Sequence, residues 1–444
     1  MEVELNTGDT AWILAATALV LLMTPGVAFF YGGMVRVKSV LNMMMMSVFA
    51  IGGVSVLWVV FGYSLSFGDG GNGFIGDLSS AGLGDLVGKL AVNGAVYPIP
   101  ALIFAMFQLM FAIITVALIS GAVADRMKFV TWIVFALAWA TLVYFPVAHW
   151  VFDFGSAEVD DGAGWLAARG VLDFAGGTAV HINAGAAGLA LVIVMGKRIG
   201  FGKSPMRPHN VPFILLGASL LYFGWFGFNA GSALGSGQLA AVAFTNTMVA
   251  AAVGILGWLL VEKIRDGRPT TLGAASGAVA GLVAITPACA FVEPWGAIAI
   301  GAIAGIICAL AVTLKYKLGY DDSLDVVGVH MIGGIIGCLL IGFFATTTVN
   351  EFGKNGLFYG GDWSVLGTQA LGAGAVLAYS FVVTLILAFI LKFTLGLRVS
   401  EDAEVQGIDQ DQHAESAYEY GDSGGGGGVL AGIGHAAHNK SEVE

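Results

Sequence analysis

Two histidines, His181 and His330, are the residues best suited to do chemistry in this sequence of 444 residues. Each lies in a long apolar stretch that is otherwise almost free of ionisable groups. A charged side chain among lipid-facing residues costs roughly 2.5–3.5 kcal/mol, so such residues usually line a pathway or pair with each other. Two similar polar positions in distant parts of one chain indicate a single site built from two related halves.

Two neutral imidazoles can hydrogen-bond to each other, because each ring has one nitrogen that donates and one that accepts. Such a pair would line a narrow pore with polar groups while staying uncharged, and it can pass a proton between its rings. One alternative is a buried histidine satisfied by a backbone carbonyl. Another is a two-histidine metal site, but the sequence shows no matching third ligand, whereas zinc normally takes three or four from the protein. We therefore expect a pore and no metal.

Each histidine segment opens with an aspartate, Asp173 eight residues before His181 and Asp325 five residues before His330. A carboxylate at a helix start accepts hydrogen bonds from free backbone N–H groups, so both aspartates are predicted to cap helices. Only Asp173 lies on the side predicted below to be external. It is therefore the one candidate of the two for recruiting an external cation.

The composition identifies the class of protein that holds these groups. Hydrophobic residues make up 57% of the chain and charged residues 11%, whereas a typical soluble domain is about 25% charged. Apolar runs of ~20 residues recur along the chain, and each can cross about 30 Å of hydrocarbon as a helix. Because the runs are continuous rather than alternating, a strand barrel is excluded. The 66 glycines favour closely packed helices.

The apolar runs predict an all-α polytopic membrane protein with eleven transmembrane helices. Their expected ranges are 11–33, 40–67, 99–123, 129–152, 175–196, 211–231, 240–262, 271–290, 295–315, 327–347 and 367–396. Of the 19 Lys and Arg residues, fifteen lie at or after the ends of odd-numbered spans, and only Lys89, Arg169 and Lys354 lie in the opposite loops. The positive-inside rule then places the N-terminus outside and the C-terminus in the cytoplasm.

Spans 1–5 and 6–10 are thereby predicted to form two inverted five-helix repeats, with one extra helix. Inverted repeats commonly place a pathway at their interface near the membrane midplane. His181 and His330 occupy the fifth span of each repeat, so we expect them to meet. Residues 1–400 form the membrane domain, and residues 401–444 form an acidic, glycine-rich cytoplasmic tail that is expected to be disordered from about residue 421. The sequence shows no nucleic-acid-binding signature.

Aromatic residues gather near the predicted external ends of three spans. Phe107 and Phe111 are four residues apart and share a helix face, while spans 4 and 6 end in HWVF (149–152) and GWFGFNAGS (224–232). Aromatic side chains at span ends usually form the interfacial belt. Rings gathered at an outer mouth also bind small cations through their faces. The residue pattern leaves both interpretations open.

Six stretches resemble the ammonium transporter family (Amt/Mep/Rh), specifically its prokaryotic Amt branch. They are TPGVAFFYGGMVR (24–36), DFAGGTAVHINAG (173–185), YFGWFGFNAGSA (222–233), ITPACA (285–290), DVVGVHMIGG (325–334) and LGLRVSEDAE (395–404). The similarity extends from about residue 10 to about residue 420. It implies a multi-pass plasma-membrane protein that forms homotrimers, with eleven spans and one pore per subunit.

The resemblance also implies roles for individual residues. His181 and His330 correspond to paired pore histidines, Asp173 to a structural aspartate near the external site, and Thr286 to a threonine near the pore. The implied ammonium-binding site consists of Phe111, Trp150, Phe152, Phe228 and Ser232, with Phe107 and Phe111 as gate rings. Family members often have tryptophan where this chain has Phe152, so either Trp150 or Phe152 supplies the ring that closes the site.

The function implied is ammonium uptake, with methylammonium as an analogue. Ammonium would bind at the aromatic site and lose a proton, and ammonia would pass the histidines; a separate proton relay would make transport electrogenic. The alternative is an ammonium sensor with little flux, but a dedicated sensor would be expected to carry an appended signalling domain. The tail resembles a region that accompanies regulation by the PII signalling protein. The sequence shows no enzymatic constellation and implies no cofactor.

Overall fold

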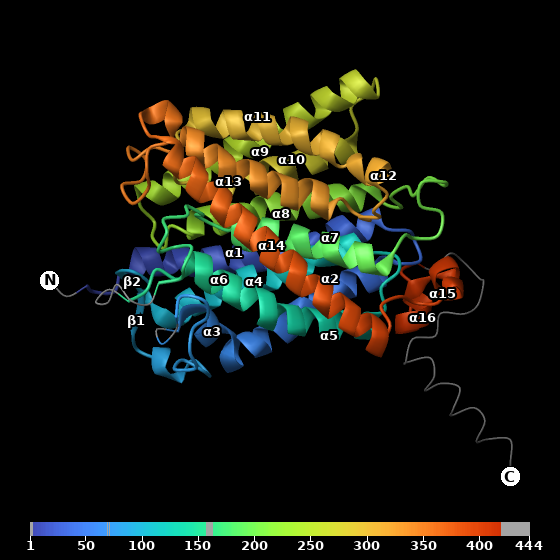
Figure 1. Cartoon of the computed structure of the whole chain (residues 1–444), viewed down its shortest axis with the longest axis horizontal. Helices are drawn as coiled ribbons and strands as arrows, with labels where there is room; N and C mark the ends of the chain where they lie inside the picture. The colour runs from blue at the N-terminus through green and yellow to red at the C-terminus, as the bar shows by residue number, and fades with distance from the viewer. Residues whose placement is uncertain (1–2, 69, 71, 157–162, 419–444) are drawn as a thin grey trace, which may run out of the picture.

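The computed structural model describes residues 3–68, 70, 72–156 and 163–418, which form a bundle of long helices (Figure 1). The first part contains α1 (Thr7–Met34), α2 (Val40–Leu57), η1 (Trp58–Gly62), α3 (Tyr63–Phe67), η2 (Gly84–Leu86), β1 (Leu90–Val92), β2 (Val96–Pro100), α4 (Ala101–Val123), α5 (Phe129–Trp139), η3 (Ala140–Tyr144), α6 (Phe145–Phe152), η4 (Gly177–Ile182) and α7 (Asn183–Met195). The second part contains α8 (Val211–Gly231), α9 (Gln238–Arg265), α10 (Thr271–Ile285), α11 (Pro294–Ala311), α12 (Leu314–Leu318), η5 (Val327–Met331), α13 (Ile332–Phe344), η6 (Leu357–Tyr359), α14 (Trp363–Thr394), α15 (Glu401–Gln406) and α16 (Ile408–His413).

The helical stretches follow the predicted spans. Among the residues that the structure describes, ten stretches are long and apolar enough to cross a membrane, and α10 is a shorter apolar helix of 15 residues. These stretches fall on the eleven predicted ranges to within five residues at either end. The predicted polytopic helical fold is therefore confirmed in its main features.

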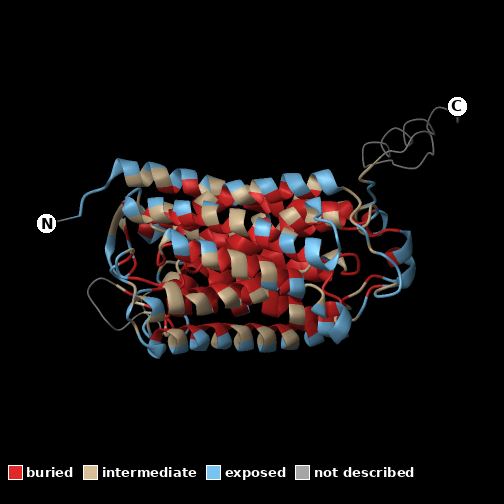
Figure 2. Cartoon of the chain, turned by 90° about the horizontal axis from the view of Figure 1, so that it is seen from above, coloured by how far each residue is buried: buried red, intermediate tan, exposed pale blue. Residues whose placement is uncertain are grey.

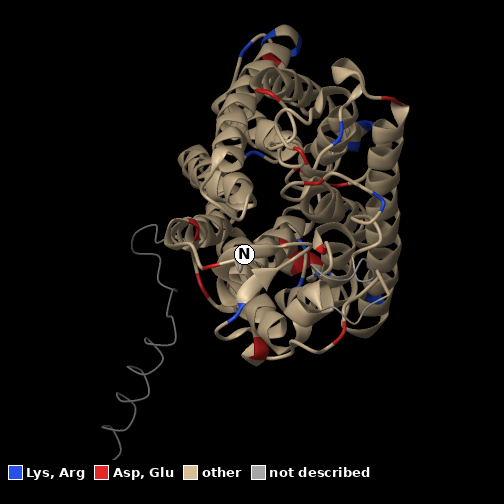
Figure 3. Cartoon of the chain, turned by 90° about the vertical axis from the view of Figure 1, so that its left-hand side faces the viewer, with Lys and Arg blue, Asp and Glu red and all other residues tan. Residues whose placement is uncertain are grey.

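The flanks of the bundle are apolar, as a lipid-facing surface requires. Residues buried in the bundle lie between the helices, and exposed residues follow the outer helix faces (Figure 2). Large hydrophobic side chains on these faces are more than half exposed, among them Phe223, Leu256, Val382 and Ile386. Lys, Arg, Asp and Glu lie mainly in the loops and at helix ends (Figure 3). Hydrocarbon is a suitable solvent for such a belt, whereas water is not.

One β-hairpin interrupts the helical pattern. Strands β1 and β2 pair antiparallel in the segment that joins the second and third predicted spans, for which the sequence analysis predicted no strand. The turn between them contains Asn93 and Gly94, and Gly94 has a positive φ of 71°. Asn-Gly is a strong signal for a tight hairpin turn, because both residues tolerate the left-handed conformation. The hairpin lies at the same end of the bundle as the start of α1 (Figure 1).

The opposite end holds the loops that follow the odd-numbered spans, together with α15 and α16 (Figure 1). Arg198 pairs with Asp125 at 3.1 Å and with Asp321 at 2.9 Å, which joins three of these loops. The tail is connected to these loops as well. Arg398 pairs with Glu404 of the tail and donates to the Lys197 carbonyl, in one of the loops, at 2.8 Å. Residues 401–418 of the predicted tail thus pack on the bundle. The disorder expected from about residue 421 falls outside the described residues.

Candidate functional site

His181 and His330 lie next to each other inside the bundle. Their Nδ1 atoms are 3.3 Å apart, and their rings are nearly parallel with centroids 5.3 Å apart. Both side chains are buried. Because two Nδ1 atoms can share only one proton between them, one ring donates and the other accepts. The hydrogen bond therefore makes the two Nε2 atoms unlike, one protonated and one with a free lone pair.

The segments that carry the histidines, η4 and η5, are short π-helical turns. Such turns often occur at functional sites. The two segments cross in opposite directions, and a glycine four residues after each histidine permits the close approach. A Cβ on Gly185 would lie 2.6 Å from the Met331 nitrogen, and a Cβ on Gly334 would lie 2.8 Å from the Gly177 oxygen. A larger residue at either glycine would separate the histidines.

Asp173 caps the first segment, as predicted. Its carboxylate accepts the backbone N–H groups of Gly176, Gly177 and Thr178 at 2.7–2.8 Å and that of Ala179 at 3.3 Å, and it also accepts the Thr178 hydroxyl. All of these donors belong to the segment that follows it. The carboxylate is therefore committed to holding η4 in place.

The cap of the second segment is Asp322 rather than the predicted Asp325. The Asp322 carboxylate accepts the N–H groups of Val326 at 3.1 Å and Val327 at 2.7 Å. Asp325 instead pairs with Lys315 at 2.7 Å. The prediction for Asp325 was wrong because a nearby lysine, which the linear sequence does not place, takes its carboxylate.

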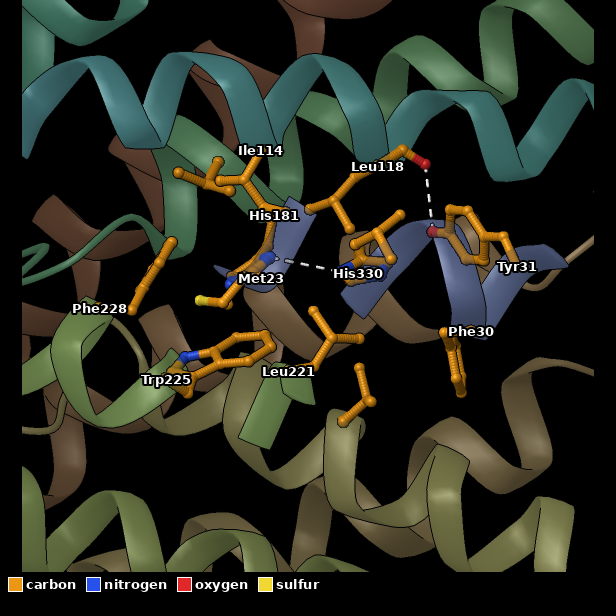
Figure 4. Close-up of a pocket in the computed structure, with 13 residues that line it drawn as sticks. Met23, Phe30, Tyr31, Ile114, Leu118, His181, Leu221, Trp225, Phe228 and His330 are labelled. Carbon is orange, nitrogen blue, oxygen red and sulfur yellow. Dashed lines mark hydrogen bonds between the residues drawn. The ribbon is translucent and has the colours of Figure 1, made fainter. Parts of the chain in front are cut away.

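The histidines line a narrow and largely apolar cavity (Figure 4). Its other walls come from α1, α4, α8 and α10, with Met23, Ile114, Leu221 and Val279 among the lining residues. The volume open to the centre of a water molecule is about 10 Å³, which is room for about one such molecule. A second cavity shares Phe30, Tyr31, Val279 and His330 with the first and continues to Ser276 and Asp325. The two cavities outline a path along the bundle.

Three of the predicted phenylalanines close the other end of this path. The Phe111 ring lies 4.4 Å from Phe228 and 5.0 Å from Phe107, measured between centroids. Phe228 in turn lies 6.1 Å from His181 and lines the first cavity. Ser232 follows one turn later, and its hydroxyl donates to the Phe228 carbonyl at 2.9 Å. These aromatic rings separate the histidines from the hairpin end of the bundle.

The two candidate rings at the end of α6 point in different directions. Phe152 faces the path, with its ring 6.4 Å from Phe111. Trp150 packs instead on Tyr379 at 4.6 Å and on Trp165 at 5.5 Å, and its Nε1–H donates to the Phe74 carbonyl at 2.7 Å. The structure brings Phe152, and not Trp150, to the aromatic group around Phe111.

Comparison with known proteins identifies the family. A model of the Ammonium Transporter Family matches residues 11–418. The chain belongs to this family. A relative from Mycobacterium tuberculosis (strain ATCC 25618 / H37Rv), named an ammonium transporter, is 57% identical over 432 residues, which cover 93% of this chain and 90% of the relative. The protein is therefore an ammonium transporter of the plasma membrane with multiple membrane-spanning helices.

Solved structures of Mep2 and of an Amt protein share its fold. The crystal structure of Candida albicans Mep2 matches with a TM-score of 0.83 at 37% identity, covering 90% of this chain and 88% of its own. A structure described as a sensor Amt protein matches with a TM-score of 0.83 at 29% identity, covering 91% of this chain and 98% of its own. The sequence resemblance to the ammonium transporter family is thus confirmed.

Sequence reasoning about this ammonium transporter missed Trp225 as a cavity residue. Its ring lies nearly parallel to that of His181, with centroids 5.4 Å apart, and its Nε1–H donates to the Thr286 hydroxyl at 2.8 Å. The predicted Thr286 therefore contacts the cavity residue Trp225. The three-residue spacing between Trp225 and Phe228 places both on one helix face. That spacing is the sequence signal that could have distinguished Trp225, as a cavity residue, from the tryptophans of an interfacial belt.

The opposite end of the path is surrounded by buried charges. Burial lowers the pKa of Arg126 to about 10, partly offset by Asp321. Burial also raises the pKa of Asp322 to about 6, against the opposing effect of Lys315.

Among the described residues, no group of three or more His, Cys, Asp or Glu side chains is placed to hold a metal ion.

Proposed function

We propose that this transporter carries ammonium across the membrane by taking its proton and passing ammonia along the cavity beside His181 and His330. One observation carries the proposal: two imidazoles form a hydrogen bond inside a cavity that is otherwise largely apolar and has room for about one water-sized molecule. Ammonia is neutral and small enough for such a space, and it can exchange hydrogen bonds with the ring nitrogens.

The external binding site is formed by Phe111, Phe152, Phe228 and Ser232. A small cation binds to the faces of aromatic rings, and the attraction strengthens as water is removed. The Ser232 hydroxyl can accept a hydrogen bond from ammonium while it donates to the Phe228 carbonyl. Phe107 and Phe111 form the gate between this site and the histidines. Their rings contact each other along α4, and Phe111 meets Phe228 of α8 from the other side of the path.

Deprotonation must precede passage, because moving a bare ammonium ion into an apolar space costs many kcal/mol. Asp173 is not the proton acceptor, since its two oxygens are occupied by N–H and O–H donors of its own segment. The buried Nε2 of His181 has no hydrogen-bond partner among the described residues. His181 is therefore the group nearest the gate that can receive a proton and pass it to His330.

A separate path for the proton would make transport electrogenic. Removal of that proton would also explain selectivity for ammonium over potassium. Potassium resembles ammonium in charge and size, but it has neither N–H donors nor a removable proton. A site that requires a proton to be removed therefore rejects potassium at the histidine pair. His181 and His330 are the residues in the path that distinguish the two ions.

We propose the predicted membrane topology as part of this account: eleven spans, two inverted repeats, an external N-terminus and a cytoplasmic tail. The antiparallel crossing of η4 and η5 supports the inverted repeats. The basic loops and the tail meet at one end of the bundle, which supports a cytoplasmic location for that end. The homotrimer and a regulatory PII protein, which the family resemblance implies, belong to the same proposal.

Single substitutions of the two histidines test the proposed function. In proteoliposomes, His181→Ala and His330→Ala should each lower ammonium-evoked current at least about a hundredfold, the usual scale of a lost proton-transfer group. His209→Ala is the matched control, because His209 lies away from the cavity and contacts the tail. Its Nδ1–H donates to the Val35 carbonyl at 3.0 Å, and its Nε2 lies 3.0 Å from the Tyr418 hydroxyl. Unchanged selectivity for ammonium over potassium in both pore variants would contradict the proposal.

A sensor with little flux is the second candidate function. It is favoured by the similarity to the solved sensor Amt protein and by the contacts of residues 401–418 with the bundle. Methylammonium uptake separates the two: a transporter accumulates the analogue in proportion to the imposed gradient, whereas a sensor binds it without sustained uptake. We favour transport because the path past the histidines continues to Asp325.

A further inference from the structure

Helix α14 is the extra helix of the predicted topology, and it touches the His181 segment at two places. It runs diagonally across the bundle and lies against α7 (Figure 1). We propose that Gln369 and Ser380 of α14 are positioning residues that hold His181 in hydrogen-bonding range of His330. The inference rests on the proposed function of the histidine pair and assigns a role to a helix outside the two repeats.

Gln369 clamps the chain immediately before Asp173. Its Oε1 accepts the Leu172 N–H at 2.7 Å, and its Nε2 donates to the Leu172 carbonyl at 2.7 Å. The same Nε2 donates to the Cys338 carbonyl at 3.3 Å. Gln369 is fully buried, so its three hydrogen bonds do not exchange with water. Since Asp173 caps η4, fixing Leu172 fixes the start of the histidine segment.

Ser380 holds the other end of the same segment. Its hydroxyl donates to the Asn183 carbonyl at 2.8 Å, two residues beyond His181, and Ser380 is fully buried. Gln369 and Ser380 are eleven residues apart, which is close to three helical turns and therefore one face of α14. One straight helix thus supports both ends of the stretch 172–183.

His181 depends on these backbone contacts because its side chain has few others. Its Nδ1 contacts His330, its Nε2 has no partner among the described residues, and its ring packs on Trp225 and Phe228. The ring is therefore placed by the backbone from which it extends. A misplacement of about 1 Å at a reacting group can cost on the order of a hundredfold in rate.

The corresponding loop before His330 is held in a different way. Arg126 donates to the Asp321 carbonyl at 2.6 Å and to the Ser323 hydroxyl at 2.6 Å, and Arg198 pairs with the Asp321 carboxylate. Charged groups thus position the His330 half, and uncharged groups of α14 position the His181 half. Because Gln369 also donates to the Cys338 carbonyl of α13, beyond His330, Ser380→Ala is the α14 variant that should act through the His181 half alone.

The direct test is the structure of Gln369→Leu, determined by cryo-electron microscopy beside the wild type. Leucine keeps the approximate volume but removes all three hydrogen bonds, so the His181–His330 Nδ1 distance should lengthen beyond about 3.5 Å, the limit of a hydrogen bond. Ser380→Ala removes one hydrogen bond and is the second variant, in which the same lengthening is measured if Gln369→Leu does not fold. Thr384→Val is the matched control, since it removes a buried hydrogen bond of α14 to Trp139. It should leave the distance unchanged.

Transport by the same variants provides a second readout. Gln369→Leu and Ser380→Ala should each lower maximal ammonium-evoked current about tenfold, leave the KM within about twofold, and raise the relative potassium current. When either α14 substitution is added to His181→Ala, it should change the maximal current by less than about a further twofold. An unchanged Nδ1 distance in both α14 variants would overturn the inference even if the histidine variants are inactive. Full current in His181→Ala would instead refute the proposed function.

Discussion

Asp173 and Asp322 perform the same structural task in the two halves of the protein. Each lies eight residues before one of the paired histidines, and each accepts backbone N–H groups at the start of the π-helical turn that carries this histidine. The equivalence extends to the glycine four residues after each histidine. Each histidine is therefore held by the same three features: an aspartate cap, a π-helical turn and a glycine that allows close packing.

The cap at Asp322 should make stability depend on pH. Burial raises the pKa of Asp322 to about 6 from an ordinary 3.8. A carboxyl group whose pKa is raised by folding stabilises the protein fully below the unfolded pKa, and this stabilisation is lost as the pH rises through the folded pKa. The stability of the wild type relative to Asp322→Asn should thus fall by about 2 kcal/mol between pH about 4 and about 6.5. Unfolding in detergent across this range measures it, and parallel pH profiles would refute it.

Phe152 should determine the affinity of the external site. Tryptophan binds cations more strongly than phenylalanine, and a whole cation–π contact is worth about 0.5–1 kcal/mol at exposed sites and about 2 kcal/mol or more where water is removed. Phe152 is buried, so Phe152→Trp should lower the KM for methylammonium uptake by up to about fivefold, which corresponds to about 1 kcal/mol. Trp150→Phe should change the KM less than about twofold, because Trp150 packs on Tyr379 and Trp165. A larger effect of Trp150→Phe would assign the closing ring to Trp150.

Thr286 should support the pore through Trp225. Thr286→Val removes the acceptor of the buried indole N–H, which costs about 1–3 kcal/mol when a buried donor loses its partner. We expect a lower unfolding midpoint and a reduced preference for ammonium over potassium, since the Trp225 ring packs on His181. Thr286→Ser keeps the hydroxyl and should restore both properties. Equal losses in the valine and serine variants would exclude this role.

Asp409 should fasten the tail to the bundle. Its carboxylate accepts the N–H groups of Leu41 at 3.0 Å and Asn42 at 2.8 Å, at the start of α2. Losing such a cap costs about 1 kcal/mol, so Asp409→Ala should speed amide hydrogen exchange at Leu41 and Asn42 about fivefold. Asp411→Ala, at an exposed neighbouring position, is the control. Equal exchange in the two variants would show that the cap does not hold the tail.

The sequence was sufficient to locate the histidine pair and its first cap. His181 and His330 occupy the fifth apolar run of each half, and runs of this length are defined by hydropathy alone. The Asn93–Gly94 turn also contained a readable hairpin signal. These features depend on residues that are close in the chain, where local physical rules apply.

Features that depend on contacts between elements were not predictable. Asp322 and Asp325 are both placed to cap η5, and the packing of Lys315, from α12, decides between them. The direction of Trp150 depends on Tyr379 of α14, more than two hundred residues later, and that of Phe152 on Phe111 of α4. Each of these outcomes is decided by which side chain of another element fills the adjacent space.

The most direct test of the central claim is the charge carried per molecule of substrate. In proteoliposomes with an imposed membrane potential, radiolabelled methylammonium uptake and current can be measured together. The account predicts one elementary charge per methylammonium taken up, faster uptake at an inside-negative potential, and loss of both signals in His181→Ala and His330→Ala. Undiminished uptake without current, at any potential, would contradict a proton relay through the histidine pair.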